Sequence, residues 1–313
     1  EVRWEIAADD HFGRVVDSGR ALALPAWAHS VHVESERLAP DREYCYRFHA
    51  AGATSPTGRF RTAPAPDALP AALRLALVSC QQYEQGWYAA YRHLVQDAPA
   101  LVLHVGDYIY ESSWGDNLVR RHEGPEPVTL EQYRARHACY KLDADLQAAH
   151  AACAWVLTWD DHEVDNDYAN LASEELVPPD IMRARRLAAY RAYYEHQPLR
   201  RAMRPHGHGL ALHTHFDYGR LARFHVLDTR QFRSAQPCPP PGEGGAASIP
   251  DCPERHAESA TVLGAAQERW LAAGLRARDT RWHFIAQTTR MAAADAAPGP
   301  DLSFYSDAWD GYT

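Results

Sequence analysis

Three short runs of apolar residues, separated by helical segments, restrict the fold of this chain more than any other feature. The runs lie at 75–78, 101–103 and 155–157. A strand that is apolar at every position needs cover on both of its faces, as the strands of parallel sheets have. Helical periodicity is present at 129–153, 181–196 and 263–275, and a further strand is expected at 282–285. This alternation predicts an α/β domain with a layered α/β/α architecture over residues 74–313.

The first 62 residues have a different pattern. Apolar and polar residues alternate at 2–6 and again at 44–48, and a turn signal lies at 39–41. Since no helical period is present, we predict a small all-β sandwich domain at 1–62, of immunoglobulin or fibronectin type III character. A stiff Pro/Ala linker at 63–73 follows it. Because the chain opens directly into strand-like alternation, we expect it to be trimmed within this domain.

Charge and hydropathy exclude several classes of protein. The sequence has 32 Lys and Arg against 41 Asp and Glu, which gives a net charge of −9. A nucleic-acid-binding protein would need a basic face, so nucleic acid is not an expected partner. An apolar run of about 18 residues is absent from the sequence, so no transmembrane segment is expected. Small phosphorylated substrates remain compatible with this charge, because a local cluster of cations can reverse the field inside a cleft.

Two of the six cysteines bracket a loop that is rich in proline and glycine. These are Cys238 and Cys252. A disulfide between them would restrain the loop, and two free surface thiols are the alternative. We favour the disulfide, which indicates an oxidising compartment and a secreted or periplasmic protein.

Polar side chains follow each of the three predicted buried strands. The loops are 79–81 with Cys80, 106–111 with Asp107, and 159–166 with Asp160 and Asp161. Loops that follow the strands of an α/β sheet converge at one edge, where ligands bind. Neighbouring carboxylates repel one another unless a cation neutralises them. Two cations about 4 Å apart can clamp both the attacking and the leaving oxygen of a phosphoryl transfer. The loops therefore predict a metal cluster that gathers Asp107, Asp160 and Asp161.

Each loop also has a plain structural interpretation. Asp107 could belong to an ordinary turn, Asp160 could cap a helix, and Cys80 could be a packed thiol. We favour the metal site because the structural interpretations would have to hold at all three loops independently. Asp228 and Arg230 follow a further strand, but a structural ion pair explains them as well, so we leave them out of the predicted site.

The same loops resemble a known superfamily. Gly106-Asp107 followed by Asp161-His162-Glu163 is similar to the second and third sequence blocks of the calcineurin-like metallophosphoesterases. Longer strings resemble one branch, the PhoD-type alkaline phosphatase/phosphodiesterase family. They are SCQ at 79–81, GDYIYE at 106–111, TWDDHEVDN at 158–166, LDTRQFR at 227–233 and DAWDGY at 307–312. The likeness runs from the N-terminal sandwich to the last residue.

The resemblance implies a site for two metals. Cys80, Asp107 and Tyr110 resemble the family's ligands of a ferric ion (Fe3+), and Asp107 would bridge to calcium (Ca2+). Asp161 and Asn166 resemble calcium ligands. Hard oxygen donors suit calcium, and a thiolate needs a strong cation beside it to stay ionised. Another divalent metal pair is the alternative.

The implied activity is the hydrolysis of small phosphate mono- and/or diesters. A metal-bound hydroxide or oxide would attack phosphorus directly, with Asp107 at the metals, and no covalent phosphoenzyme is expected. His162 matches the histidine that contacts the phosphate or assists the leaving group. The family's GD-x-H string and a later histidine lie beyond DAWDGY, and Gly-Asp-x-His does not occur in the sequence. We therefore expect a fragment of a longer enzyme; a catalytically inactive phosphate- or metal-binding protein of the same fold is the alternative.

Overall fold

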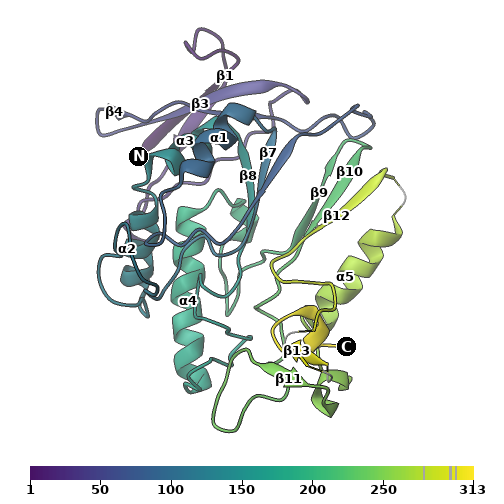
Figure 1. Cartoon of the computed structure of the whole chain (residues 1–313). Coiled ribbons are helices and arrows are strands. Elements are labelled where there is room, and N and C mark those ends of the chain that lie inside the picture. Colours follow the sequence, from purple (N-terminus) through teal and green to yellow (C-terminus); the bar gives the residue numbers. More distant parts are fainter. Residues whose placement is uncertain (278, 296–297, 300–301) are drawn as a thin grey trace.

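The N-terminal region consists of one antiparallel sheet (Figure 1). The structure, a computed structural model, describes residues 1–277, 279–295, 298–299 and 302–313. The strands of this sheet are β1 (Val2–Ala7), β2 (Val15–Ala21), β3 (Glu43–Ala50), β4 (Ala53–Thr54) and β5 (Gly58–Arg61). Strand β1 lies between β2 and β3, and β3 also pairs with β4 and β5. The β-rich character predicted for this region is confirmed, but its strands form a single sheet.

The apolar face of this sheet packs towards the rest of the chain and not against a second sheet. Trp4 pairs with Phe48 and Ile6 with Tyr46, so these four side chains share one face. Helix α3 (Ala144–Ala152) contacts β5 on this side. The predicted two-sheet sandwich is therefore corrected. Alternating strands show that one face needs cover, but they do not show what covers it.

The three apolar runs form the predicted parallel sheet. Strands β6 (Leu75–Val78), β7 (Leu101–Val105) and β8 (Ala154–Thr158) lie in the order β6–β7–β8. All five residues of β7 are buried, as expected for a central strand with cover on both faces. Four helices lie on one side of this sheet (Figure 1): α1 (Ala89–Asp97), α2 (Leu130–Tyr140), α3 and α4 (Pro179–His196).

The helix predicted at 129–153 is two helices. Thr129 begins α2 with a capping box that includes Gln132. Asp143 begins α3, because its side chain accepts hydrogen bonds from the backbone nitrogens of Asp145 and Leu146, both at 3.0 Å. The break follows from this second cap.

A second sheet lies face to face with the first. Its strands are β9 (Thr214–Tyr218), β10 (Ala222–Val226) and β12 (Trp282–Ala286), with β10 in the middle. Leu103 and Val105 of the first sheet share an apolar cluster with Phe224 and Val226 of β10. Helix α5 (Gly264–Arg276) covers the outer side (Figure 1). The layer order is therefore α/β/β/α and not the predicted α/β/α, because the strands at 214–226 and 282–286 form a sheet of their own.

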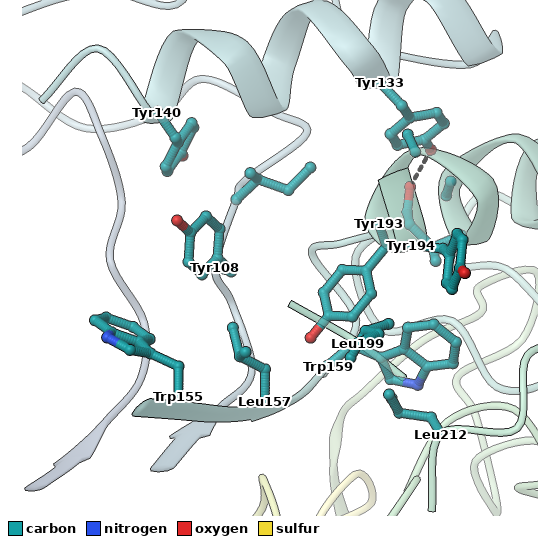
Figure 2. Packing of buried hydrophobic residues seen from close by; sticks show 14 of the residues in the cluster. Tyr108, Tyr133, Tyr140, Trp155, Leu157, Trp159, Tyr193, Tyr194, Leu199 and Leu212 are labelled. Atoms are coloured by element: carbon teal, nitrogen blue, oxygen red, sulfur yellow. Dashed lines mark hydrogen bonds between the residues drawn. The ribbon is translucent and has the colours of Figure 1, made fainter. Parts of the chain in front are cut away.

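Aromatic side chains fill much of the core between the first sheet and its helices. Figure 2 shows Tyr108, Trp155, Trp159 and Tyr193 within this cluster. The indole of Trp159 stacks on Tyr190, with ring centroids 4.2 Å apart. Such rings bury large areas and keep the loops after β7 and β8 on a rigid base.

The remaining elements are short. They are β11 (Ser248–Pro250), β13 (Ser303–Tyr305) and the 3-10 helices at Pro25–Trp27, Arg201–Met203, Pro253–His256 and Trp309–Gly311. Strands β11 and β13 pair with each other. The predicted disulfide between Cys238 and Cys252 is present. Across the described residues, no helix has the length and apolar character needed to cross a membrane.

Candidate active site

The three predicted loops meet at the carboxyl ends of β6, β7 and β8. The backbone nitrogen of Cys80 donates to Gly106 O, and that of Gln81 donates to Asp107 O, both at 3.1 Å. Cys80 and Asp107 both have φ of 57°. This left-handed backbone conformation is energetically costly for residues other than glycine. Residues that adopt it are found most often at functional sites. A Cβ atom on Gly106 would lie 2.7 Å from the backbone nitrogen of Asp160, so only glycine permits this approach of the third loop.

Asp107 lies at the centre of the arrangement. Its Oδ2 accepts a hydrogen bond from the Tyr110 hydroxyl at 3.1 Å. Its Oδ1 is buried and has no hydrogen-bond partner within the described part of the chain. Ligand atoms of Asp107, Asp161 and His162 lie within 4.8 Å of one another. Burial, together with the charges of Asp161 and Asp160, raises the pKa of Asp107 well above its usual value. A cation would remove both the repulsion and the missing partner.

Cys80 and Tyr110 offer sulfur and oxygen beside the same carboxylate. Loss of hydration and the charge of Asp107 raise the pKa of the Cys80 thiol to about 12. The same two causes raise the pKa of Tyr110. The protein alone therefore keeps both groups protonated, and only a strongly charged cation would hold them as thiolate and phenolate. This donor set fits a ferric ion. Cys80 itself lies outside the close group formed by Asp107, Asp161 and His162.

Two carboxylates of the third loop hold the loops in place. Glu163 accepts hydrogen bonds from the backbone nitrogens of Tyr108 at 2.6 Å and Asp160 at 2.9 Å, which ties the second loop to the third. Asp161 accepts one from the Asp167 nitrogen at 2.7 Å. Asp160, which was predicted to join the cluster, turns instead to Arg230, with Oδ1 2.6 Å from its Nε.

Glu111 orients His162. The carboxylate Oε2 lies 2.8 Å from His162 Nδ1, and the imidazole ring lies 4.1 Å from the ring of Tyr110. Burial opposes a charge on this ring, but Glu111, Asp161 and Asp107 outweigh it and raise the pKa of His162 to about 10. The imidazole is therefore a proton-bearing donor at the edge of the cluster. Glu111 belongs to the GDYIYE string, which was the available signal, but no role was predicted for it.

Asn166 lies on the same loop but on its outer side. Its Nδ2 donates to Glu174 Oε2 at 2.6 Å, and its backbone nitrogen donates to Glu111 Oε1 at 3.2 Å. The first bond uses Nδ2, so the amide oxygen of Asn166, which is the atom that a cation would bind, takes no part in it. No described contact joins Asn166 to Asp107, so its predicted role as a ligand stays a prediction.

Comparison with known proteins identifies the family. A model of the PhoD-like phosphatases matches residues 75–313, and a model of their N-terminal domain matches residues 1–64. The chain belongs to the PhoD-like phosphatase family. It is 43% identical to alkaline phosphatase D of Bacillus subtilis over 316 residues, which cover 99% of this chain and 53% of that protein. A solved structure of PhoD matches with a TM-score of 0.94 and 44% identity, over 99% of this chain and 59% of the other. The chain thus spans about half the length of the curated relative.

Arg230 is the main residue of this PhoD-like site that the sequence analysis left out. Its guanidinium is 2% exposed and lies 2.6 Å from Asp160 Oδ1, 3.5 Å from Asp161 Oδ1 and 2.6 Å from Asp307 Oδ2. Arg233 also pairs with Asp307. The position of Arg230 after β10 was a signal, but its partners lie about 70 residues away on both sides in the chain. The structural role considered for Arg230 is confirmed, but its ion pairs are with Asp160, Asp161 and Asp307, whereas Asp228 accepts only the backbone nitrogen of Arg230 at 3.1 Å.

Proposed function

We propose that this PhoD-like chain carries part of the active site of a metal-dependent phosphoric ester hydrolase. The observation that supports this most is the buried, unpartnered Oδ1 of Asp107 beside Asp161 and His162. A carboxylate placed in this way needs a cation. The membership of the family and the likeness to alkaline phosphatase D point to phosphate mono- and/or diesters as substrates.

The donor set suits two different ions. Cys80, Asp107 and Tyr110 would hold a ferric ion, since a thiolate and a phenolate are anionic, strongly basic donors that a trivalent cation stabilises. Asp107, Asp161 and Asn166 would hold calcium through oxygen atoms. Another divalent pair is the alternative. When bound, such ions stabilise the charge on a phosphate group and supply a strong nucleophile near neutral pH.

The protein's own residues supply positioning and a proton. Glu111 fixes the ring of His162, which leaves Nε2 free of that contact and able to donate to a phosphate or leaving-group oxygen. Arg230 is too deeply buried to touch substrate, so it orients Asp160 and neutralises part of the negative charge. The Cys238–Cys252 disulfide supports a secreted or periplasmic location.

A spectrum tests the ferric assignment. The natural full-length protein, isolated with its metals, should contain iron and calcium and should show a violet phenolate-to-iron band. Tyr110→Phe should bleach this band. Tyr108→Phe is the matched control, because Tyr108 is on the same loop but its hydroxyl contacts His150 on the helix side. A colourless, iron-free enzyme that still hydrolyses p-nitrophenyl phosphate would refute the ferric assignment.

Turnover tests the function itself. The same protein should hydrolyse p-nitrophenyl phosphate, bis(p-nitrophenyl) phosphate or both. Tight binding of inorganic phosphate without any turnover would instead favour an inactive binding protein.

A further inference from the structure

A large cavity lies between the N-terminal sheet and the α/β region. Its volume is about 1080 Å3. Trp4, Tyr46 and Phe48 of the sheet form one side, and Ala148 of α3 and Leu199, after α4, belong to the other. In Figure 1 the N-terminal sheet lies across the end of the α/β region that holds α1 and α3. Cavities between domains, with mainly apolar walls and a few polar groups, are common ligand sites.

Lys141 lines this cavity and is the only lysine in the sequence. Its ammonium group donates to His196 O, the carbonyl of the last residue of α4. Within the residues that the structure describes, Lys141 forms no ion pair with a carboxylate. Burial and the charge of Lys141 lower the pKa values of the nearby His32, His150 and His196, and a histidine cannot neutralise an ammonium in any case.

The acidic residues of the same cavity already have partners. Glu5 pairs with Arg47 at 2.6 Å and His49 at 2.8 Å, Glu34 pairs with Arg201 at 3.3 Å, and Glu195 pairs with Arg134 at 2.7 Å and Arg191 at 3.1 Å. These carboxylates are therefore occupied. Lys141 is left as a cation without a counter-charge at one end of an apolar cavity.

A second polar group of this cavity is incompletely hydrogen-bonded. The side chain of Gln197 is 2% exposed and lies beside the Tyr108 hydroxyl, but neither Oε1 nor Nε2 forms a well-aligned hydrogen bond in the described chain. Gln197 lines the same cavity as Lys141. Buried polar atoms without partners are costly, so these atoms mark a place where a ligand or water bonds.

Capping of helix α4 explains only part of this arrangement. A cation near the last carbonyl of a helix is favourable, but it faces about half a unit of negative charge. The bond to His196 O uses one of the three ammonium donors. Burial lowers the pKa of Lys141 to about 8, which is the expected result when no anion is at hand.

We propose that this cavity binds a single-chain anionic amphiphile, an alkyl carboxylate. The carboxylate would accept hydrogen bonds from Lys141 and Gln197, and the alkyl chain would lie along Trp4 and Phe48. This site is separate from the proposed hydrolytic site and does not depend on it.

Calorimetry with sodium octanoate, decanoate and dodecanoate, each below its micelle concentration, tests the proposal. Each added methylene should tighten binding by roughly twofold to fourfold, as expected for burial of apolar surface. Decan-1-ol should bind at least about tenfold more weakly than decanoate, because a charge-assisted hydrogen bond is lost. Lys141→Met should weaken decanoate by a similar factor. Arg121→Met, at an exposed arginine, is the matched control and should change nothing.

A second measurement locates the ligand without any substitution. Incorporation of 13C-lysine labels Lys141 without changing its ammonium group, and dodecanoate should shift the Cε resonance of Lys141 in proportion to saturation. Ala148→Trp, which places an indole in the cavity beside α3, should weaken both the heat and the shift. The proposal is overturned if no heat is measured, if the resonance stays fixed while heat is released, or if decan-1-ol and decanoate bind equally well.

Discussion

The unpaired oxygen of Asp107 is the strongest residue-level argument for a metal site. A buried polar atom without a partner costs about 1–3 kcal/mol in proteins, and more when it is charged. Among the described residues, the Tyr110 hydroxyl donates to Oδ2 of the Asp107 carboxylate, and Oδ1 has no hydrogen-bond partner. Asp160 and Asp161 add repulsion. The described residues thus gather more negative charge at this point than His162 and Arg230 offset.

Asp107→Asn should separate the effect of this carboxylate on stability from its role in metal binding and hydrolysis. In the natural protein, the substitution should lower metal content and hydrolysis by at least about 100-fold, because the shared ligand is lost. When a chelator keeps the protein free of metal, the substitution should raise the free energy of unfolding by about 1 kcal/mol, because a buried charge is removed. Atomic emission and thermal denaturation measure the two effects. Glu36→Gln, at an exposed acid, is the control; unchanged metal content in Asp107→Asn would contradict the assignment.

Arg230 should be essential for stability. Arg230→Met leaves Asp160 and Asp307 buried without their main counter-charge, which should lower the free energy of unfolding by about 3–5 kcal/mol. Arg223→Met, on strand β10 before the loop that carries Arg230, is the matched control. Its partner Asp217 is 36% exposed, so the loss should stay at or below about 1 kcal/mol. Urea denaturation measures both values, and equal losses would show that the Arg230 pairs are not worth more than a surface pair.

The sequence predicted the residues whose chemistry is local and missed those defined by distant partners. Asp107 and His162 follow buried strands, so their convergence was expected from the order of the strands alone. The position of Arg230 after a strand was a weak local signal, but it does not show which carboxylates the arginine pairs with. Its role depends on Asp307, which folding brings to it from 77 positions further along the chain.

At the scale of elements, strand type was predictable but sheet membership was not. The runs that became β6, β7 and β8 are apolar at every position, and this pattern needs cover on both faces. Periodicity does not show whether that cover is helix or sheet. The cover on one side is the sheet of β9, β10 and β12, which gives four layers where three were predicted.

The loop closed by the Cys238–Cys252 disulfide should support the third loop of the site. Ala246 N donates to Asp167 Oδ2 at 3.0 Å, and Gly244 N donates to Glu174 O at 3.2 Å. The cysteines are 14 positions apart. In the chain-entropy model, a disulfide that closes a loop of this size stabilises the fold by about 3 kcal/mol. The free energy of unfolding of the double variant Cys238→Ser/Cys252→Ser should therefore fall by roughly this amount. Calorimetric melting measures this loss of stability. Cys45→Ala, which removes a free thiol, is the control. Equal melting of the disulfide variant and the parent chain would show that the loop is held by its other contacts.

At the scale of the whole molecule, several histidines are buried in the neutral form. His104 is 1% exposed and His137 is fully buried. Burial lowers the pKa of His104 to about 3, and burial and nearby positive groups lower the pKa of His137 and bring that of His196 to about 3. These residues lie on β7, α2 and α4, so their ionisation concerns the whole first sheet and its helices.

The sign of the resulting pH dependence follows from these directions. A histidine with a lowered folded-state pKa stabilises the fold fully above its unfolded pKa of about 6.5. That stability is lost as the pH falls from about 6.5 towards the folded-state value, since the unfolded chain binds the proton first. Each such histidine should contribute a slope of about 1.4 kcal/mol per pH unit in this window.

His104→Phe should remove the contribution of one histidine to this pH dependence of the free energy of unfolding. Phenylalanine keeps an aromatic ring beside Trp155 and Tyr108. The variant should therefore gain stability relative to the parent chain by about 1.4 kcal/mol for each pH unit below about 6, and should show no such trend between pH 7 and 8. Urea denaturation from pH 5 to 8 measures the difference, with carboxylate titration common to both proteins. A difference in stability that is independent of pH would mean that the pKa of His104 is the same in the folded and the unfolded protein, so that burial imposes no penalty on its charged form.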